Sequence, residues 1–252
     1  MLSFAAIAEE EEMHLIEGPL GRRTYRRCIG EPLHPARESC VTLAAIRETM
    51  GSYTFASQYQ QNPTPVGGAM VKTEWLRFYN PADLPERFSR VVQSWDTANK
   101  AAELNDYSVC TTWGVVGKSL YLLDVLRKRL NYPDLRRKVL DMVLRHSATT
   151  ILIEDKASGT QLIQDLRGEV YGVVPYEPPP GTDKIMRLHA QTAMFENGFV
   201  WLPRGAPWLD DYVRELTSFP GTKYDDQVDS TTQALAYLGT SSWLAIWERL
   251  GQ

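Results

Sequence analysis

Acidic residues stand at three points of the sequence where a fold would hold them rigidly. Asp96 follows the apolar end of one predicted strand, and Glu154 follows another. Asp225, Asp226 and Asp229 lie in the first turn of a predicted helix. Carboxylate oxygens are the ligands that Mg²⁺ and Mn²⁺ prefer, and clustered carboxylates repel each other unless a cation neutralises them. These positions therefore predict a site for divalent metal ions.

Two such ions, roughly 3.5–4 Å apart, can activate a water and stabilise the leaving oxygen in phosphodiester cleavage. The histidines and cysteines are too scattered to form a competing ligand set (His14, His34, His146, His189, Cys28, Cys40, Cys110). A second interpretation of the helical acids stays open, because acidic residues at a helix N-terminus also act as caps and dipole partners. Asp225 fits either interpretation, and Asp229 taken alone fits a solvated helix face.

Three strands with short connections precede the second acid. The patterns at 90–97, 107–116 and 119–126 each favour a β-strand, and the second places Val109, Thr111, Trp113 and Val115 on one face. Strands joined so closely pair antiparallel, so this part of the chain predicts a three-strand antiparallel meander.

The remainder of the chain alternates helices with strands. Hydrophobic spacing predicts strands at 149–153 and 170–175, and helices at these ranges: 133–145, 159–166, 184–196, 207–219 and 225–238. Crossover helices then bring the later strands into the sheet, which gives an α/β fold, a mixed sheet with helices on both faces. If the fourth strand pairs beside the first, Asp96 and Glu154 meet, and the last helix adds Asp226 and Asp229, which share one helix face.

The first 80 residues differ in character from the rest. They carry an acidic run at 9–12, four arginines between 22 and 27, and much proline and glycine. Helices are predicted at 41–50 and 53–60. We predict an arm or linker over 1–80, a catalytic domain over 81–240 and a tail over 241–252.

Composition excludes several classes of protein. Hydrophobic residues make up 43% and charged residues 23% of the 252, which is ordinary for a globular chain and argues against disorder. No apolar stretch is long enough to cross a membrane. Three cysteines without paired spacing fit a reducing cytosol. The net charge of −4 implies that any contact with DNA is local.

Five segments resemble, in order and spacing, the nuclease domain of tailed-phage large terminases: QSWDTA (93–98), NDYSVCTTWG (105–114), LYLLDVLR (120–127), ILIEDKASG (151–159) and KYDDQVDSTTQALAYL (223–238). The resemblance implies an RNase H-like fold and a metal-dependent endonuclease that cuts double-stranded DNA during phage genome packaging, with two Mg²⁺ or Mn²⁺ ions. It implies catalytic and metal-binding roles for Asp96, Glu154 and Asp226, with Asp225 and Asp229 as further metal ligands. Many members of the family have a histidine where this chain has Tyr224.

The stretch at 51–79 resembles the point where a large terminase passes from its ATPase domain into its nuclease. The resemblance implies as partners double-stranded DNA, the terminase ATPase domain, the small terminase subunit and the portal protein, in the cytoplasm of an infected bacterium. Residues 114–119 (GVVGKS) imitate a phosphate-binding loop, but they have two residues between the glycines instead of four and join two strands. We therefore expect no ATPase activity, and a chain that is either a C-terminal fragment or accompanied by a separate motor.

Further residues are candidates for supporting roles. Asp106, in the connection after the first strand, and Lys156, shortly after Glu154, are possible additions to the site, although an ordinary turn and a helix-start lysine explain them equally well. Candidate DNA contacts are Lys118, Arg127, Lys128, Arg129, Lys184 and Arg187. A solvated helix face or a connecting loop is the alternative for these cations. Two rival functions stay open: a resolvase or transposase nuclease of the same fold, and a non-catalytic docking module of the packaging motor.

Overall fold

The computed structural model describes residues 4–18, 21–61, 69–97, 107–156, 158–221 and 224–250. The chain divides into two compact units, 1–68 and 69–252, which we describe separately. The division lies twelve residues before the boundary expected at 80, because Val71, Leu76 and Tyr79 are buried with the second unit.

The first unit combines a β-hairpin with two short helices. Strands β1 (Glu12–Gly18) and β2 (Gly21–Arg27) pair antiparallel, with Glu12 opposite Arg27. Helices α1 (Cys40–Met50) and α2 (Ser52–Gln58) confirm the two helices predicted there. Gly51 separates them with φ at 81°, a conformation that favours glycine. The hairpin was not predicted, since its strands alternate charged with apolar residues on both faces.

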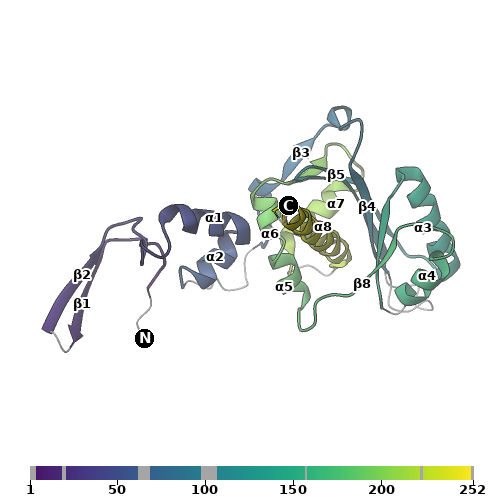
Figure 1. Cartoon of the computed structure of the whole chain (residues 1–252). Coiled ribbons are helices and arrows are strands. Elements are labelled where there is room, and N and C mark those ends of the chain that lie inside the picture. Colours follow the sequence, from purple (N-terminus) through teal and green to yellow (C-terminus); the bar gives the residue numbers. More distant parts are fainter. Residues whose placement is uncertain are drawn as a thin grey trace. The chain divides into compact units, whose positions relative to one another are not determined.

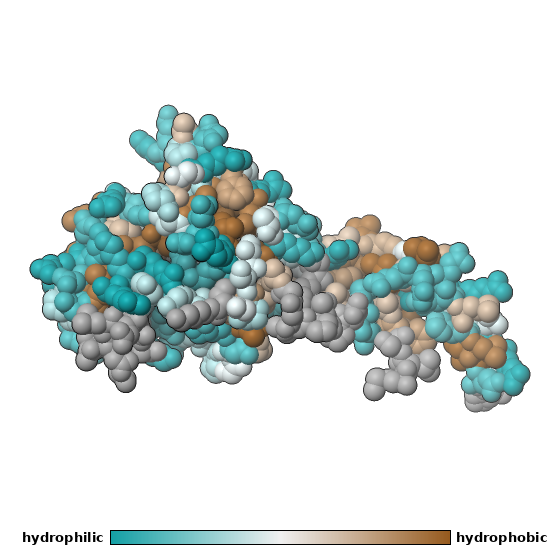
Figure 2. Space-filling model, turned by 180° about the vertical axis from the view of Figure 1, so that it is seen from behind, coloured by the Kyte–Doolittle hydropathy of each residue, from teal (hydrophilic) through white to brown (hydrophobic). Residues whose placement is uncertain are grey.

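Hydrophobic side chains reach the surface of this unit, and brown patches mark such residues in Figure 2. Those exposed on β1 are Met13, Leu15 and Ile16. In the described part of the chain, no helix combines the length and apolar character required to cross a membrane.

The second unit is built on a seven-stranded mixed sheet, in the order β3-β9-β6-β5-β4-β7-β8. The strands are β3 (Arg77–Tyr79), β4 (Arg90–Asp96), β5 (Ser108–Val116), β6 (Ser119–Lys128), β7 (Thr150–Glu154), β8 (Val173–Tyr176) and β9 (Val200–Pro203). Strands β4, β5 and β6 form the predicted antiparallel meander, and β7 and β8 continue the sheet in parallel from β4.

Helices cover both faces of this sheet (Figure 1). On one face lie α3 (Tyr132–His146) and α4 (Ser158–Leu166). On the other lie α5 (Lys184–His189), α6 (Thr192–Glu196), α7 (Leu209–Ser218) and α8 (Asp226–Leu250). The predicted α/β architecture, a mixed sheet between two layers of helices, is confirmed.

Several details differ from the prediction. The helix expected over 184–196 is two helices, α5 and α6, because the chain turns at Ala190 and Gln191. The short edge strands β3 and β9 were not predicted, and two short 3₁₀ helices accompany β3 (Thr73–Trp75 and Pro81–Asp83). Helix α8 continues through Leu250 instead of giving way to a tail at 241. The imitation phosphate loop is the tight turn between β5 and β6, as expected.

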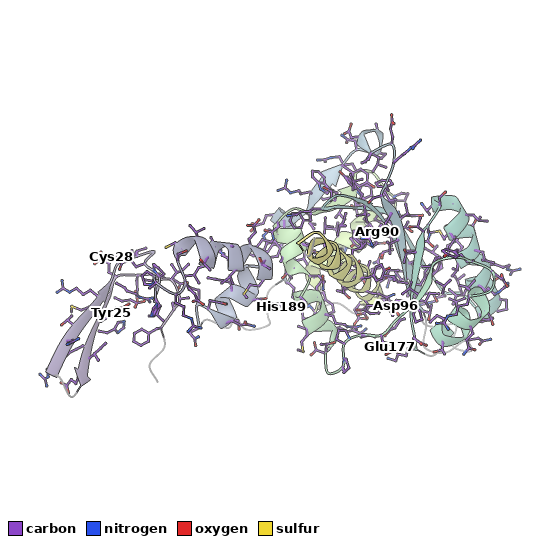
Figure 3. The ribbon with its side chains drawn as sticks, viewed as in Figure 1. Tyr25, Cys28, Arg90, Asp96, Glu177 and His189 are labelled. Atoms are coloured by element: carbon purple, nitrogen blue, oxygen red, sulfur yellow. The ribbon has the colours of Figure 1, made fainter. Side chains whose placement is uncertain are left out.

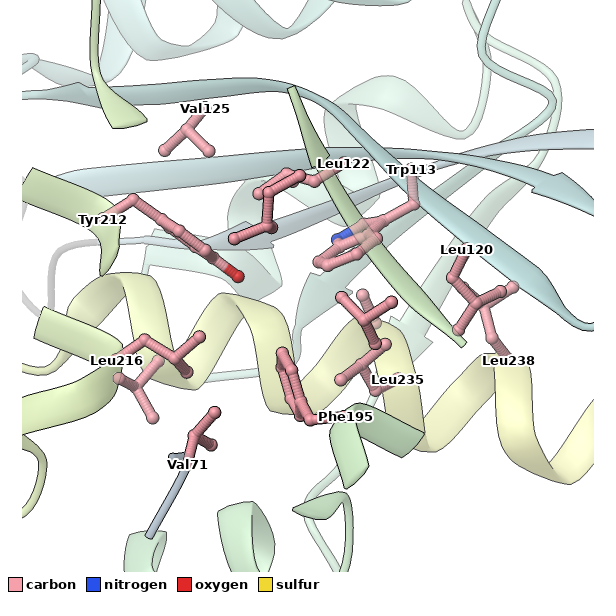
Figure 4. Packing of buried hydrophobic residues seen from close by; sticks show 14 of the residues in the cluster. Val71, Trp113, Leu120, Leu122, Val125, Phe195, Tyr212, Leu216, Leu235 and Leu238 are labelled. Carbon is pink, nitrogen blue, oxygen red and sulfur yellow. The ribbon is translucent and has the colours of Figure 1, made fainter. Parts of the chain in front are cut away.

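Two hydrophobic clusters fill the spaces on either side of the sheet. Side chains of successive strand residues point to opposite faces, so Val92 belongs to the cluster under α8 and Trp95 to the cluster under α3 and α4. Figure 4 shows the first cluster, in which Trp113 and Leu122 of the sheet pack towards Leu235 of α8. This packing holds the first half of α8 against β4 and β5.

Candidate metal centre

Strand pairing brings the first two predicted acids together. Strands β4 and β7 are parallel neighbours, with Trp95 beside Ile153. The next residues along the two strands are Asp96 and Glu154, and both point to the face that α8 covers, like Val92 and Leu152. Figure 3 labels Asp96 at the end of β4, next to α8. The expected meeting of Asp96 and Glu154 thus follows from the observed register.

The chain leaves β7 through a turn that only glycine permits. A Cβ atom on Gly159 would collide with the carbonyl oxygen of Glu154. Because α4 begins so close to the strand end, the Gly159 position serves the tight strand-to-helix turn.

Buried hydroxyl groups fix α8 across the tip of β4. Ser94 donates a hydrogen bond of 2.7 Å to the carbonyl oxygen of Ser230, and Ser230 donates one of 2.7 Å to that of Ser94. The backbone N–H of Thr111 donates to Ser230 Oγ at 3.1 Å. Ser230 directly follows Asp229, and Ser94 lies two residues before Asp96. The reciprocal bonds therefore set the position of the α8 acids relative to Asp96.

Four carboxylates influence one another at this point. We call Asp96, Glu154, Asp226 and Asp229 the acidic cluster. Burial raises the pKa of Asp96 well above its usual range, and the negative charges of the other three raise it further. Burial, with the nearby charge of Glu215, raises the pKa of Asp226 to about 6. Such mutual repulsion is the condition that a divalent cation relieves.

Two cations from α5 occupy part of this negative field. Lys184 Nζ lies 2.7 Å from Asp225 Oδ1 and 2.6 Å from Asp229 Oδ2. Arg187 Nη2 donates to Asp229 Oδ1 at 3.0 Å. The carboxylates beside Lys184 raise the pKa of its ammonium group despite partial burial, so it is firmly charged. Both carboxylate oxygens of Asp229 are therefore taken by positive side chains.

The donor chemistry fits a hard divalent ion, because every member of the acidic cluster offers carboxylate oxygens. Within the described residues, however, no three His, Cys, Asp or Glu side chains are arranged to hold one ion as they stand. The ion pairs of Lys184 and Arg187 with Asp229 give a physical reason, since they turn its oxygens towards α5. Metal binding at Asp229 thus requires these cations to move.

A buried glutamate that the sequence analysis missed supports the first turn of α8. Glu215 of α7 accepts hydrogen bonds from the backbone N–H of Gln227 at 2.7 Å and of Val228 at 3.3 Å. Its second oxygen accepts from the side-chain amide of Gln227 at 2.7 Å. A signal was present, since Glu215 lies on the buried face of α7 with Tyr212 and Leu216.

Arg127 lies between this glutamate and the acidic cluster. Its Nη1 is 3.7 Å from Glu215 Oε2, and its Nη2 is 3.8 Å from Asp226 Oδ2. Two aromatic rings hold the guanidinium, with centroids 4.3 Å away for Tyr107 and 4.8 Å for Tyr224. Tyr224, which stands where many terminases have histidine, thus contacts a cation beside the cluster.

The remaining candidates lie outside this group. Arg129 contacts only the Tyr107 ring among the described aromatic contacts near the site, at 4.6 Å. Lys118 lies in the turn at the far end of β5 from Asp96 and packs over Phe199, while Lys128 and Lys156 are exposed. Asp106 falls outside the described residues.

A sequence profile gives the first comparison with known proteins. The profile of the family described as the Terminase RNaseH-like domain matches residues 93–238, more than half of the chain. The match contains every member of the acidic cluster. A comparison with curated protein sequences found no match.

Solved structures give the second comparison. A complete large terminase from a thermophilic bacteriophage is similar at a TM-score of 0.59 and 13% identity, over 79% of this chain and 53% of that one. The large terminase nuclease from the thermophilic phage G20c is similar with bound cobalt (TM-score 0.52, 16% identity, 68% of this chain and 98% of that one). With bound magnesium it gives a TM-score of 0.51 at 15% identity, over the same shares. The fold is thus RNase H-like, and the chain spans about half the length of the first of these terminases.

Proposed function

Because the chain belongs to the Terminase RNaseH-like domain family, we propose that it is a divalent-metal-dependent endonuclease that cleaves double-stranded DNA during phage genome packaging. The observation that carries this proposal is the convergence of Asp96, Glu154, Asp226 and Asp229 at one end of the sheet, where three of them raise the pKa of the fourth. Relatives of the same fold were solved with bound cobalt and magnesium, which supports the use of a divalent ion.

In this proposal Asp96, Glu154 and Asp226 hold the ions, and Asp225 and Asp229 support them. Two bound Mg²⁺ or Mn²⁺ ions supply an activated water and charge stabilisation for the leaving oxygen of the phosphodiester. The chain itself contributes fixed geometry, because β4, β7 and α8 deliver the carboxylates from rigid elements. Lys184 and Arg187 place positive charge at the same end of the sheet, where DNA phosphates would approach.

The substrate and partners follow from the family. We propose double-stranded DNA as substrate, and the terminase ATPase domain, the small terminase subunit and the portal protein as partners in the cytoplasm of an infected bacterium. The local positive charge on α5, within a chain of net charge −4, fits a transient contact with the DNA backbone.

The decisive test is plasmid digestion by the wild-type chain and by Asp96→Ala, with Mn²⁺, with Mg²⁺ and with EDTA. We expect cleavage by the wild type with either ion, none in EDTA, and a loss of at least about 100-fold in rate for Asp96→Ala, since a metal ligand is removed. Asp141→Ala is the matched control, because Asp141 pairs with Lys138 on the surface of α3. Cleavage that persists in EDTA, or equal rates for wild type and Asp96→Ala, would contradict the proposal.

A non-catalytic docking module is the second candidate. It is favoured by one observation: in the described residues the acidic side chains are not arranged around an ion, and α5 cations neutralise Asp229. A docking module would neither bind Mn²⁺ tightly nor cut DNA. Isothermal titration with Mn²⁺ separates the two candidates even if the cleavage rate is low.

A further inference from the structure

Glu215 is buried although it is a carboxylate. Only 6% of it is exposed, and burial raises its pKa despite three hydrogen bonds. Burying a charge costs stability unless partners compensate, so the surroundings of this side chain indicate what it does.

Its partners are the groups that begin α8. The backbone N–H of Asp229 bonds to the carbonyl oxygen of Asp225, so Asp225 is the residue that caps the helix and its first-turn donors follow. Glu215 accepts from two of these donors, Gln227 N and Val228 N. A side chain of the helix normally does this. Here α7 supplies the acceptor, while the carboxylate of Asp225 accepts from Lys184.

Arg127 links the same glutamate to the acidic cluster. Its guanidinium lies within 4 Å of both Glu215 and Asp226, and its Nε and Nη2 atoms are buried without a hydrogen-bond partner in the described part of the chain. Glu215 therefore balances a cation that would otherwise be drawn onto Asp226 alone.

We propose that Glu215 is a positioning residue of the metal centre, which holds the first turn of α8 and restrains Arg127 so that Asp226 stays available to a divalent ion. This inference rests on the proposed function. Residues that orient metal ligands from behind typically change metal affinity or activity by about 10- to 100-fold when they are substituted.

The test measures Mn²⁺ affinity by isothermal titration in the full chain without DNA. Glu215→Gln keeps the shape and one acceptor oxygen but leaves Arg127 unbalanced, so we expect about 10-fold weaker binding, and a larger loss for Glu215→Ala. The double variant Glu215→Gln with Arg127→Gln removes both charges and should recover part of the affinity. Asp211→Asn, on the exposed face of the same helix, is the matched control and should bind as the wild type does.

The outcomes separate this role from simple stabilisation. A structural role alone would lower the melting temperature without changing Mn²⁺ affinity, and without recovery in the double variant; either result overturns the inference. Should Glu215→Ala fail to fold, the isosteric Glu215→Gln carries the test. If the wild type itself binds no Mn²⁺, the proposed function fails first. If the wild type and Glu215→Gln bind it equally, only the positioning role is wrong.

Discussion

At the scale of single residues, the same side-chain chemistry has different surroundings at each acidic position. Asp96 is held by the sheet and faces three negative charges, while Asp229 has both oxygens bound by Lys184 and Arg187. Asp226 lies between these cases, with Arg127 nearby but beyond hydrogen-bond distance. The type of residue alone therefore does not determine what each carboxylate does.

The raised pKa of Asp226 predicts a pH dependence of stability. Below about pH 4 this carboxyl is protonated in both folded and unfolded chains, and it ionises in the folded chain only near 6. Its contribution to stability is therefore full at low pH and is lost as the pH rises from about 4 to 6, on the order of 2–3 kcal/mol. Asp226→Asn lacks this titration, so its melting temperature relative to wild type should rise over that range without metal.

Thermal unfolding between pH 4 and pH 7 in EDTA checks this, with Asp211→Asn as a control that should follow the wild type. Mn²⁺ should raise the melting temperature of the wild type more than that of Asp226→Asn at pH 7. A constant difference between Asp226→Asn and wild type across this range would show that Asp226 does not titrate as described.

Sequence alone identified four of these carboxylates because each stands where a strand ends or a helix begins. It could not identify Glu215, whose only signal is a charge on the apolar face of a helix. Nor could it pair Lys184 with Asp225, since 41 residues separate them and only the packing of α5 on α8 brings them together.

At the scale of elements, α5 acts as a set of counter-ions for α8. Lys184 and Arg187 lie one turn apart on α5, and Asp183 caps that helix by accepting from the N–H of Met186. Their pairing with Asp225 and Asp229 gives the α8 acids a neutralising charge from within the chain. A metal ion competes with this charge.

Lys184→Ala should therefore bind Mn²⁺ more tightly than the wild type, by up to about tenfold, because no ammonium group has to be displaced. The metal-free variant should be slightly less stable, by about 1 kcal/mol, since the ion pairs are partly exposed. Titration calorimetry and thermal unfolding measure the two effects. Lys138→Ala, which breaks a surface pair on α3, should change neither Mn²⁺ binding nor its stabilising effect. Weaker Mn²⁺ binding by Lys184→Ala would contradict the competition.

Elements with a clear period were predicted well, including the meander, α3 and the first half of α8. The failures have physical causes. Strands β3 and β9 are only three and four residues long and gain their order from neighbours in the sheet. The hairpin at 12–27 has no uniformly apolar face, because exposed Met13 and Leu15 share it with arginines.

At the scale of the whole molecule, the acidic cluster lies within one unit. All four of its members, with Glu215, Arg127 and the α5 cations, fall between residues 69 and 252. That unit also contains both described hydrophobic clusters of the sheet.

A fragment of residues 69–252 should therefore fold alone and keep the metal-dependent cleavage of the full chain. Its core does not depend on the hairpin unit, so we expect a single cooperative unfolding transition. Circular dichroism and the plasmid assay check this, with the Asp96→Ala fragment as the inactive control. A fragment that folds but does not cut, beside an active full chain, would assign residues 1–68 a direct part in cleavage.

Helix α8 also has an electrical direction. Its N-terminal end, which carries a partial positive charge of roughly half a unit, lies beside the carboxylates of Asp226 and Asp229. The element that supplies two of the repelling acids therefore offsets part of their repulsion itself. Fraying of its first turn would remove two acids and this positive end together, so partial damage there abolishes the site in one step.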